Sequence, residues 1–133
     1  MARKKAKSST QSPEVERMQL AIAEIALESW RYSLALEKAL KKMDVMDAER
    51  FSHQYDYFTN RVNQAIAMAD LRVLDLSGQP YIAGLPVQAL NMEDFDEDEV
   101  LVITQTIEPV IMMNGRVQRI GKVMVDRIHD TEE

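Results

Sequence analysis

The chain has 133 residues, a net charge of −6 and no cysteine. This length suits one domain or two small modules with a modest core, and the lack of cysteine excludes disulfides, thiolate nucleophiles and cysteine-ligated metals. The acidic balance disfavours nucleic-acid binding through the folded body, and no apolar run approaches the roughly 20 residues of a membrane span. These features are typical of a small cytoplasmic protein that binds neither nucleic acid nor membrane.

Residues 1–11 form a basic tail that contains Arg3, Lys4, Lys5 and Lys7. Ser and Thr follow this cluster, whereas a signal peptide would continue with an apolar stretch. We interpret the tail as a disordered, solubilising N-terminus. A weak contact of the tail with nucleic acid stays open.

Two helices are predicted within residues 12–70. Ser12 is a favourable N-cap, and Pro13 suits the first helical position, where no N–H is needed. Apolar residues then recur at steps of three and four until the phase shifts near Met43. A second series predicts a helix from about residue 47 to 70, with Asp44 or Asp47 as its cap. We expect a break between the two helices.

The apolar series is too long to be buried within one small chain that also carries a β-module, so a homodimer is predicted. Whether the helices pair in parallel or antiparallel stays open. We expect residues 12–70 to be the helical dimerisation region. Its contact residues, called the seam below, are Val15, Met18, Ile22, Ile25, Tyr32, Leu36, Met43, Phe51, Tyr55, Phe58 and Val62.

Residues 71–128 have the composition of a small β-domain, with β-branched residues after a loop rich in glycine and proline. Asn114-Gly115 favours a type I′ hairpin turn, because both central residues must adopt positive φ. A two-residue loop places Met112 opposite Val117 and Val110 opposite Arg119. The predicted fold class is α+β, with dimeric helices followed by a small antiparallel β-domain and a frayed end at 129–133.

The residues around this turn resemble the C-terminal pattern of the GrpE family, the nucleotide exchange factors of DnaK-type chaperones. Gln88-Ala89 and Asn114-Gly115-Arg116 keep the family's separation, and Arg119, Val123 and Val125 also match. The resemblance covers about residues 71 to 126. The chain departs from the family at Val87, Val100-Leu101 and Val110-Ile111, where His, Pro-Gly and Gly-Tyr are common.

The resemblance implies a dimeric co-chaperone whose β-domain opens the nucleotide cleft of a DnaK-type ATPase and promotes ADP release. It also implies a partner-binding surface, for which the candidates are Asn114, Gly115, Arg116, Arg119, Met112, Met113 and Val117. The departures keep an alternative open, in which the chain is a dimeric structural or assembly adaptor that binds a larger partner without exchange activity.

No enzymatic activity, cofactor or metal is expected. The acidic run from Glu93 to Glu99 lacks the glycine and the ligand spacing of an EF-hand loop, and His53 and His129 fall in no zinc pattern. Neither a nucleophile elbow nor a phosphate-binding loop is present in the sequence. We therefore assign no catalytic residue.

Overall fold

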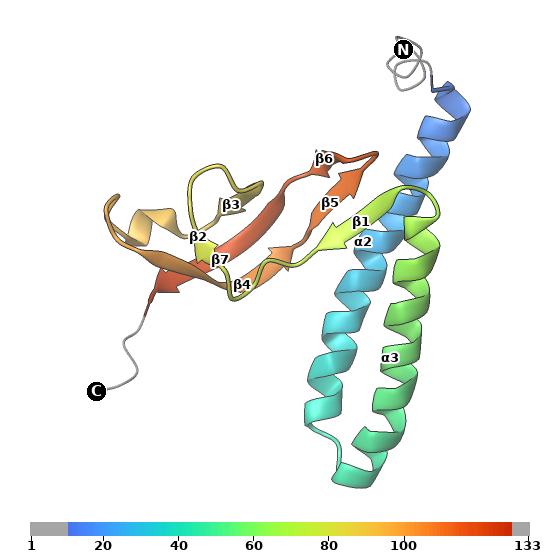
Figure 1. The fold of residues 1–133 in the computed structure, drawn as a ribbon. Coiled ribbons are helices and arrows are strands. Elements are labelled where there is room, and N and C mark those ends of the chain that lie inside the picture. The colour runs from blue at the N-terminus through green and yellow to red at the C-terminus, as the bar shows by residue number, and fades with distance from the viewer. Residues whose placement is uncertain (1–10, 129–133) are drawn as a thin grey trace.

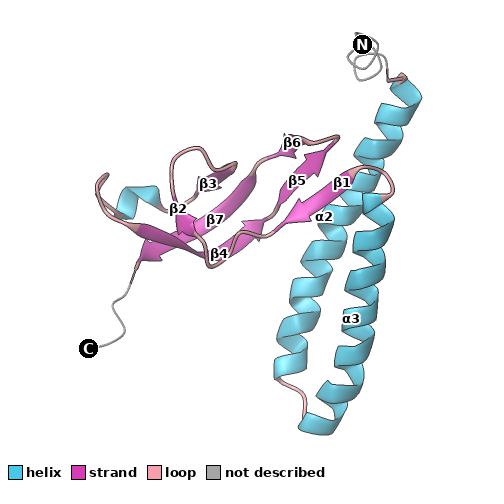
Figure 2. Cartoon of the chain, viewed as in Figure 1, coloured by secondary structure: helices cyan, strands magenta, loops and turns pink. Residues whose placement is uncertain are grey.

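The computed structural model describes residues 11–128. The predicted tail (residues 1–11) and frayed end (129–133) lie outside this part of the chain, except for Gln11. Two α-helices are followed by seven strands and one short 3-10 helix: α2 Pro13–Lys41, α3 Val45–Ala67, β1 Leu71–Leu74, β2 Pro80–Tyr81, β3 Val87–Ala89, η1 Met92–Asp94, β4 Leu101–Glu108, β5 Val110–Met113, β6 Arg116–Arg119 and β7 Gly121–Arg127. Helices and strands are segregated (Figure 2), which confirms the α+β class.

Helices α2 and α3 lie side by side as an antiparallel hairpin (Figure 1). The side chain of Ser12 accepts a hydrogen bond from the N–H of Val15, and Pro13 begins the helix. Asp44 caps α3 by accepting from the N–H of Asp47, at 2.9 Å. The predicted break is therefore confirmed, and Asp44, not Asp47, is the cap.

The strands form two sheets. Strands β1, β5 and β6 make a three-stranded antiparallel sheet, and β2, β4, β7 and β3 make a four-stranded sheet in that order. Both sheets are mainly antiparallel, as predicted, and β3 alone among the described strands runs parallel to its neighbour, β7. The connection from β3 to β7 passes through η1, β4, β5 and β6, and a parallel pair requires a long connection of this kind.

A β-bulge changes the predicted register of the hairpin. Met112 pairs with Val117 as expected, but Arg119 pairs with Ile111 and not with Val110. Gln118 is the extra residue in β6, and an extra residue turns every side chain beyond it to the other face of the strand. The bulge therefore decides which way Arg119 points.

One hydrophobic core joins the helices to the three-stranded sheet. Its buried members are Ala23, Ala26, Leu27, Ile66, Leu71 and Ile111. The four-stranded sheet has a second core around Leu101, Ile103, Val123 and Val125. The helical region and β1 thus fold as one packed unit, although the chain changes from helix to strand near residue 70.

The small residues of α2 face the partner helix of the same chain. Ala23 and Ala26 are buried there, and Trp30 is half-buried. Of the seam, Ile22 and Val62 also pack against this internal core. The packing of α2 on α3 therefore buries a stripe of residues that lies beside the seam. Only some of the seam residues take part in this packing.

Candidate functional site

The hairpin turn adopts the expected conformation and is anchored on the helices. Asn114 and Gly115 have φ values of 56° and 77°. The N–H of Asn114 donates to the carbonyl oxygen of Asp70 at 2.9 Å, and Asp70 itself has a φ of 61°. The turn between β5 and β6 is thus held against the turn that follows α3 (Figure 1).

A buried amide in α2 completes this anchor. The Nε2 of Gln19 donates to the carbonyl oxygen of Ala69 at 2.9 Å and to the Oδ1 of Asn114 at 3.0 Å. Its Oε1 accepts from the Nδ2 of Asn114 at 3.2 Å and from the side-chain amide of Gln11. Gln19 is 6% exposed, and its loss would remove the donor to the carbonyl oxygen of Ala69 and the amide pair that joins α2 to Asn114.

The sequence interpretation missed Gln19 because it followed the large apolar residues of α2. Gln19, Ala23, Ala26, Trp30 and Ser33 recur at helical spacing on a separate stripe, and this stripe faces α3 and the hairpin. A run of small residues and one amide at steps of three and four was the signal that could have found it.

Arg119 is engaged within the chain. Its guanidinium contacts Glu24 on α2 at 2.8 Å and Glu108 on β4 at 3.9 Å. The carboxylate of Glu108 also forms an ion pair with the guanidinium of Arg31 on α2, at 2.8 Å. These pairs tie β6 and the end of β4 to the same helix, so Arg119 supports the joint between helices and strands in addition to any contact outside the chain.

Arg116 and Val117 follow the turn, and both side chains are exposed. The guanidinium of Arg116 forms no hydrogen bond or ion pair within residues 11–128, and Val117 is 44% exposed. Met112 and Met113 are half-buried, and Met113 packs against the helical core. The predicted partner-binding residues thus divide into an anchored group and an exposed pair.

A hollow of about 610 Å³ lies beside the exposed pair, between the hairpin and the start of α2. Its lining is mostly polar and includes Glu16, Arg116, Val117 and Gln118. The Oε1 of Gln118, the bulge residue, is buried and lacks a hydrogen-bond partner within residues 11–128. An unpaired buried acceptor of this kind costs free energy.

Much of the predicted seam is exposed in the single chain. The exposed fractions are 46% for Val15, 65% for Met18, 64% for Ile25 and 63% for Tyr32 on α2, and 38% each for Phe51 and Phe58 on α3. Leu36, Met43 and Tyr55 are half-buried. Ile25, Tyr32 and Phe58 line a groove of about 470 Å³ between the two helices. A contiguous apolar face of this kind is typical of an interaction surface.

A second polar cluster surrounds Asp75, just after β1. Burial alone would raise the pKa of its carboxyl, but hydrogen bonds from the N–H and hydroxyl of Ser77, from Thr106 and from Trp30 together lower the pKa below 3.8. The N–H of Ser77 and the hydroxyl of Thr106 reach Oδ1 of Asp75 at 3.0 and 2.8 Å. The folded chain therefore favours the ionised carboxylate.

This preference predicts an acid-dependent loss of stability. Because the folded pKa of Asp75 lies below its ordinary value of 3.8, the contribution is present above that pH and is lost as pH falls through the folded pKa. Asp75→Asn is expected to lower the free energy of unfolding at pH 7, and the difference from the unmodified protein should shrink below about pH 4. Urea unfolding at both pH values measures it.

Asp98→Asn is the matched control for that experiment, because Asp98 is exposed and has no hydrogen bond or ion pair within the described residues. We expect it to change the free energy of unfolding by less than about 0.5 kcal/mol at either pH. An Asp75→Asn effect that stays constant down to pH 3 would show that the carboxylate charge is not what stabilises the fold.

No cluster of three or more His, Cys, Asp or Glu residues suited to a metal ion occurs within residues 11–128. Neither α2 nor α3 is apolar enough over a sufficient length to cross a bilayer, within that same part of the chain.

Fold and site together define an α+β protein in which a helical hairpin carries a small two-sheet β-module. The module presents one exposed arginine on an anchored turn. Comparison with protein-family models, with curated proteins and with solved structures gave no significant match. No match identifies a relationship to the GrpE family.

Proposed function

We propose that this protein is a dimeric, GrpE-like accessory factor that binds a DnaK-type ATPase, or a specialised relative of one, and promotes release of its ADP. The factor makes and breaks no covalent bond in this role. It acts by binding the open, nucleotide-poor state of the ATPase more tightly than the closed state, since only differential affinity shifts a conformational equilibrium.

The observation that carries the proposal is the anchored hairpin with an unengaged arginine. Gln19 and Arg119 join the hairpin to α2 by a hydrogen bond and an ion pair, which orient its tip relative to the helices. Arg116 stands on this tip with no ion pair within the described residues, and a guanidinium suits a carboxylate on a partner surface. We infer that the hairpin contacts the ATPase through Arg116 and that its attachment to the helices helps it to hold the nucleotide cleft open.

The exposed seam supports the dimer. A second copy related by a twofold axis would cover Met18, Ile25 and Tyr32 of both chains with the same apolar side chains. The hollow at Gln118 lies at the hairpin, beside the start of α2, and its lining includes none of these three residues. One chain therefore has room for both contacts, and the dimer would display two hairpins.

Exchange activity is tested by loading a DnaK-type chaperone with fluorescent ADP and following its release after addition of unlabelled ATP. Because the chain departs from the family pattern, an ATPase captured from the native host should be tested beside a generic one. Faster release by either ATPase supports the proposal. Stable binding without faster release would favour the alternative of a structural adaptor, and the absence of both binding and release would contradict the proposal.

Arg116→Ala tests the site itself. Removing a charge-assisted contact at an interface is expected to weaken the complex about five- to thirtyfold, or roughly 1–2 kcal/mol. The fold should be unaffected, because Arg116 is exposed and makes no contact of this kind within residues 11–128. Affinity is measured by isothermal titration and folding by circular dichroism.

Arg50→Ala is the matched control, because Arg50 is exposed near the N-terminal end of α3 and has only a 3.7 Å ion pair with Asp47. This variant should bind the ATPase with the affinity of the unmodified protein. Arg119→Ala is expected to lower both affinity and thermal stability, since Arg119 also bridges Glu24 and Glu108. Equal binding by Arg116→Ala and the unmodified protein would remove the hairpin from the interface.

A further inference from the structure

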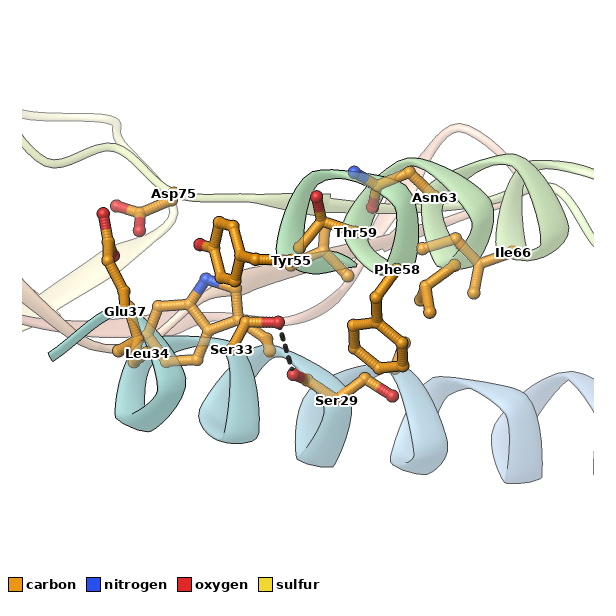
Figure 3. A pocket seen from close by; sticks show the side chains of 14 residues that line it. Ser29, Ser33, Leu34, Glu37, Tyr55, Phe58, Thr59, Asn63, Ile66 and Asp75 are labelled. Carbon is orange, nitrogen blue, oxygen red and sulfur yellow. Dashed lines mark hydrogen bonds between the residues drawn. The ribbon is translucent and has the colours of Figure 1, made fainter. Parts of the chain in front are cut away.

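A cavity of about 180 Å³ lies between α2, α3 and the end of β1, apart from the hairpin (Figure 3). Its walls include Trp30 and Leu34 from α2, and Tyr55, Phe58 and Val62 from α3. Glu37 and Asp75 lie together at one end, and the hydroxyl of Tyr55 points toward that end. The cavity thus combines an aromatic body with an acidic end.

The charge of this cavity is unbalanced. No lysine, arginine or histidine lines it, whereas two carboxylates do. Hydrogen bonds keep the pKa of Asp75 below its ordinary value despite its partial burial, so this group is ionised at neutral pH. Burial raises the pKa of Tyr55, and the charge of Glu37 raises it further, which places a negative field at the tyrosine. A cation in the cavity would relieve this field.

The two carboxylates have different surroundings. Asp75 is oriented by Ser77, Thr106 and Trp30, so its position is set by three neighbouring segments. Glu37 has no hydrogen bond or ion pair within residues 11–128. The cavity therefore holds one oriented and one unengaged carboxylate, and no positively charged side chain of its lining balances them.

The aromatic walls select among cations. A cation over the face of Trp, Tyr or Phe is attracted by the ring quadrupole, and a planar guanidinium stacks on such a face better than an ammonium does. A guanidinium is also less strongly hydrated and donates in pairs to a carboxylate. The chain itself places Arg127 over Phe95 at 5.1 Å and Arg61 over Tyr57 at 5.9 Å.

We propose that this cavity binds an alkylguanidinium cation, the chemistry of an arginine side chain, with its charge between Glu37 and Asp75 and its stem along Trp30 and Tyr55. The charged groups of this site, Glu37 and Asp75, belong neither to the hairpin nor to the seam, although Tyr55, Phe58 and Val62 of the seam also line the cavity. A bare metal ion fits less well, because two carboxylates leave most of its coordination positions unfilled.

Trp30 provides a direct probe, because it is the only tryptophan of the chain and its indole gives a single resonance in a proton–nitrogen NMR spectrum. The full chain is titrated with N-acetyl-arginine N-methylamide to about 50 mM at constant ionic strength, since one ion pair with stacking gives millimolar affinity. The citrulline analogue, which has the same shape and no charge, is the matched ligand. The lysine analogue tests the preference for a planar cation.

We expect the indole resonance to move in a saturable way with the arginine compound, less with the lysine compound and not with the citrulline compound. Glu37→Gln should weaken arginine binding about three- to tenfold while the spectrum stays that of a folded protein, because the Glu37 carboxylate is exposed and forms no hydrogen bond or ion pair within the described residues. Glu49→Gln, an exposed acid of α3 outside the cavity, should bind as the unmodified protein does. Asp75→Asn should weaken binding as well.

A titration with free arginine tests whether the cation belongs to an arginine in a polypeptide or to the free amino acid. Its α-carboxylate would be repelled by the acidic end, so tighter binding of the capped compound assigns the cavity to arginine in a polypeptide. Tighter binding of free arginine assigns it to the free amino acid, and both results keep guanidinium recognition. Equal shifts with arginine and citrulline compounds, or unchanged affinity in Glu37→Gln, would overturn the proposal.

Discussion

Replacing both Ile25 and Tyr32 by aspartate is expected to convert the proposed dimer into a folded monomer of 15.2 kDa. Both side chains are more than 60% exposed in the single chain, so the variant leaves the internal core unchanged. A twofold dimer would lose four buried apolar side chains at about 1.5 kcal/mol or more each, and roughly 6 kcal/mol corresponds to about four orders of magnitude in dissociation constant. Desolvation of the new carboxylates adds to this loss.

Sedimentation equilibrium at micromolar concentration measures the mass, and circular dichroism checks the helices. Ile82→Asp with Val100→Asp is the matched control, since these β-module residues are 61% and 69% exposed and the charge change is the same. The control should remain dimeric. An unmodified protein that sediments at 15.2 kDa would refute the dimer directly, and an Ile25/Tyr32 variant that stays dimeric would place its interface elsewhere.

Leu71→Ala is expected to lower the free energy of unfolding by roughly 3 kcal/mol and the melting temperature by roughly 10 °C. Leu71 is 1% exposed and begins β1 inside the core shared by the helices and the three-stranded sheet. Truncation there leaves a cavity in the hydrophobic core where the helices pack on the three-stranded sheet. Loss of this packing should also reduce the affinity for any partner that needs a rigid hairpin.

Urea unfolding at a fixed protein concentration gives the value, because a dimer makes the melting temperature depend on concentration. Leu90→Ala is the matched control, since Leu90 is 43% exposed and its truncation should cost less than about 0.5 kcal/mol. A Leu71→Ala loss below 1 kcal/mol would mean that helices and sheet do not depend on one core.

Several elements were predictable because their signals act over a few residues. Ser12 and Asp44 cap helices through their own side chains, and Asn114-Gly115 turns the chain through its own φ values. The helical periodicity and the composition of the strands gave the α+β class in the same way. None of these features depends on what lies across the molecule.

The joint between helices and hairpin was not predictable. Gln19 and Asn114 are 95 residues apart in sequence, and no local sequence pattern predicts a contact between them. The bulge at Gln118 was equally hidden, because one extra residue in a strand leaves the local composition unchanged while it redirects Arg119 toward Glu24. As a result, the sequence predicted which residues form the hairpin, but not which of them anchor it to the helices and which are exposed.

By itself the sequence determined where the first helix begins, where the hairpin turns and that a stripe of large apolar residues runs along α2. The tertiary structure decided that a second stripe, of smaller residues, faces inward. Ala23 and Ala26 lie against α3 because small side chains let two helices approach closely, and the larger residues Met18, Ile25 and Tyr32 are left on the surface. It also decided that Asp75 meets Trp30 and that Arg119 meets Glu24, since such pairs form only when distant segments pack on a common core.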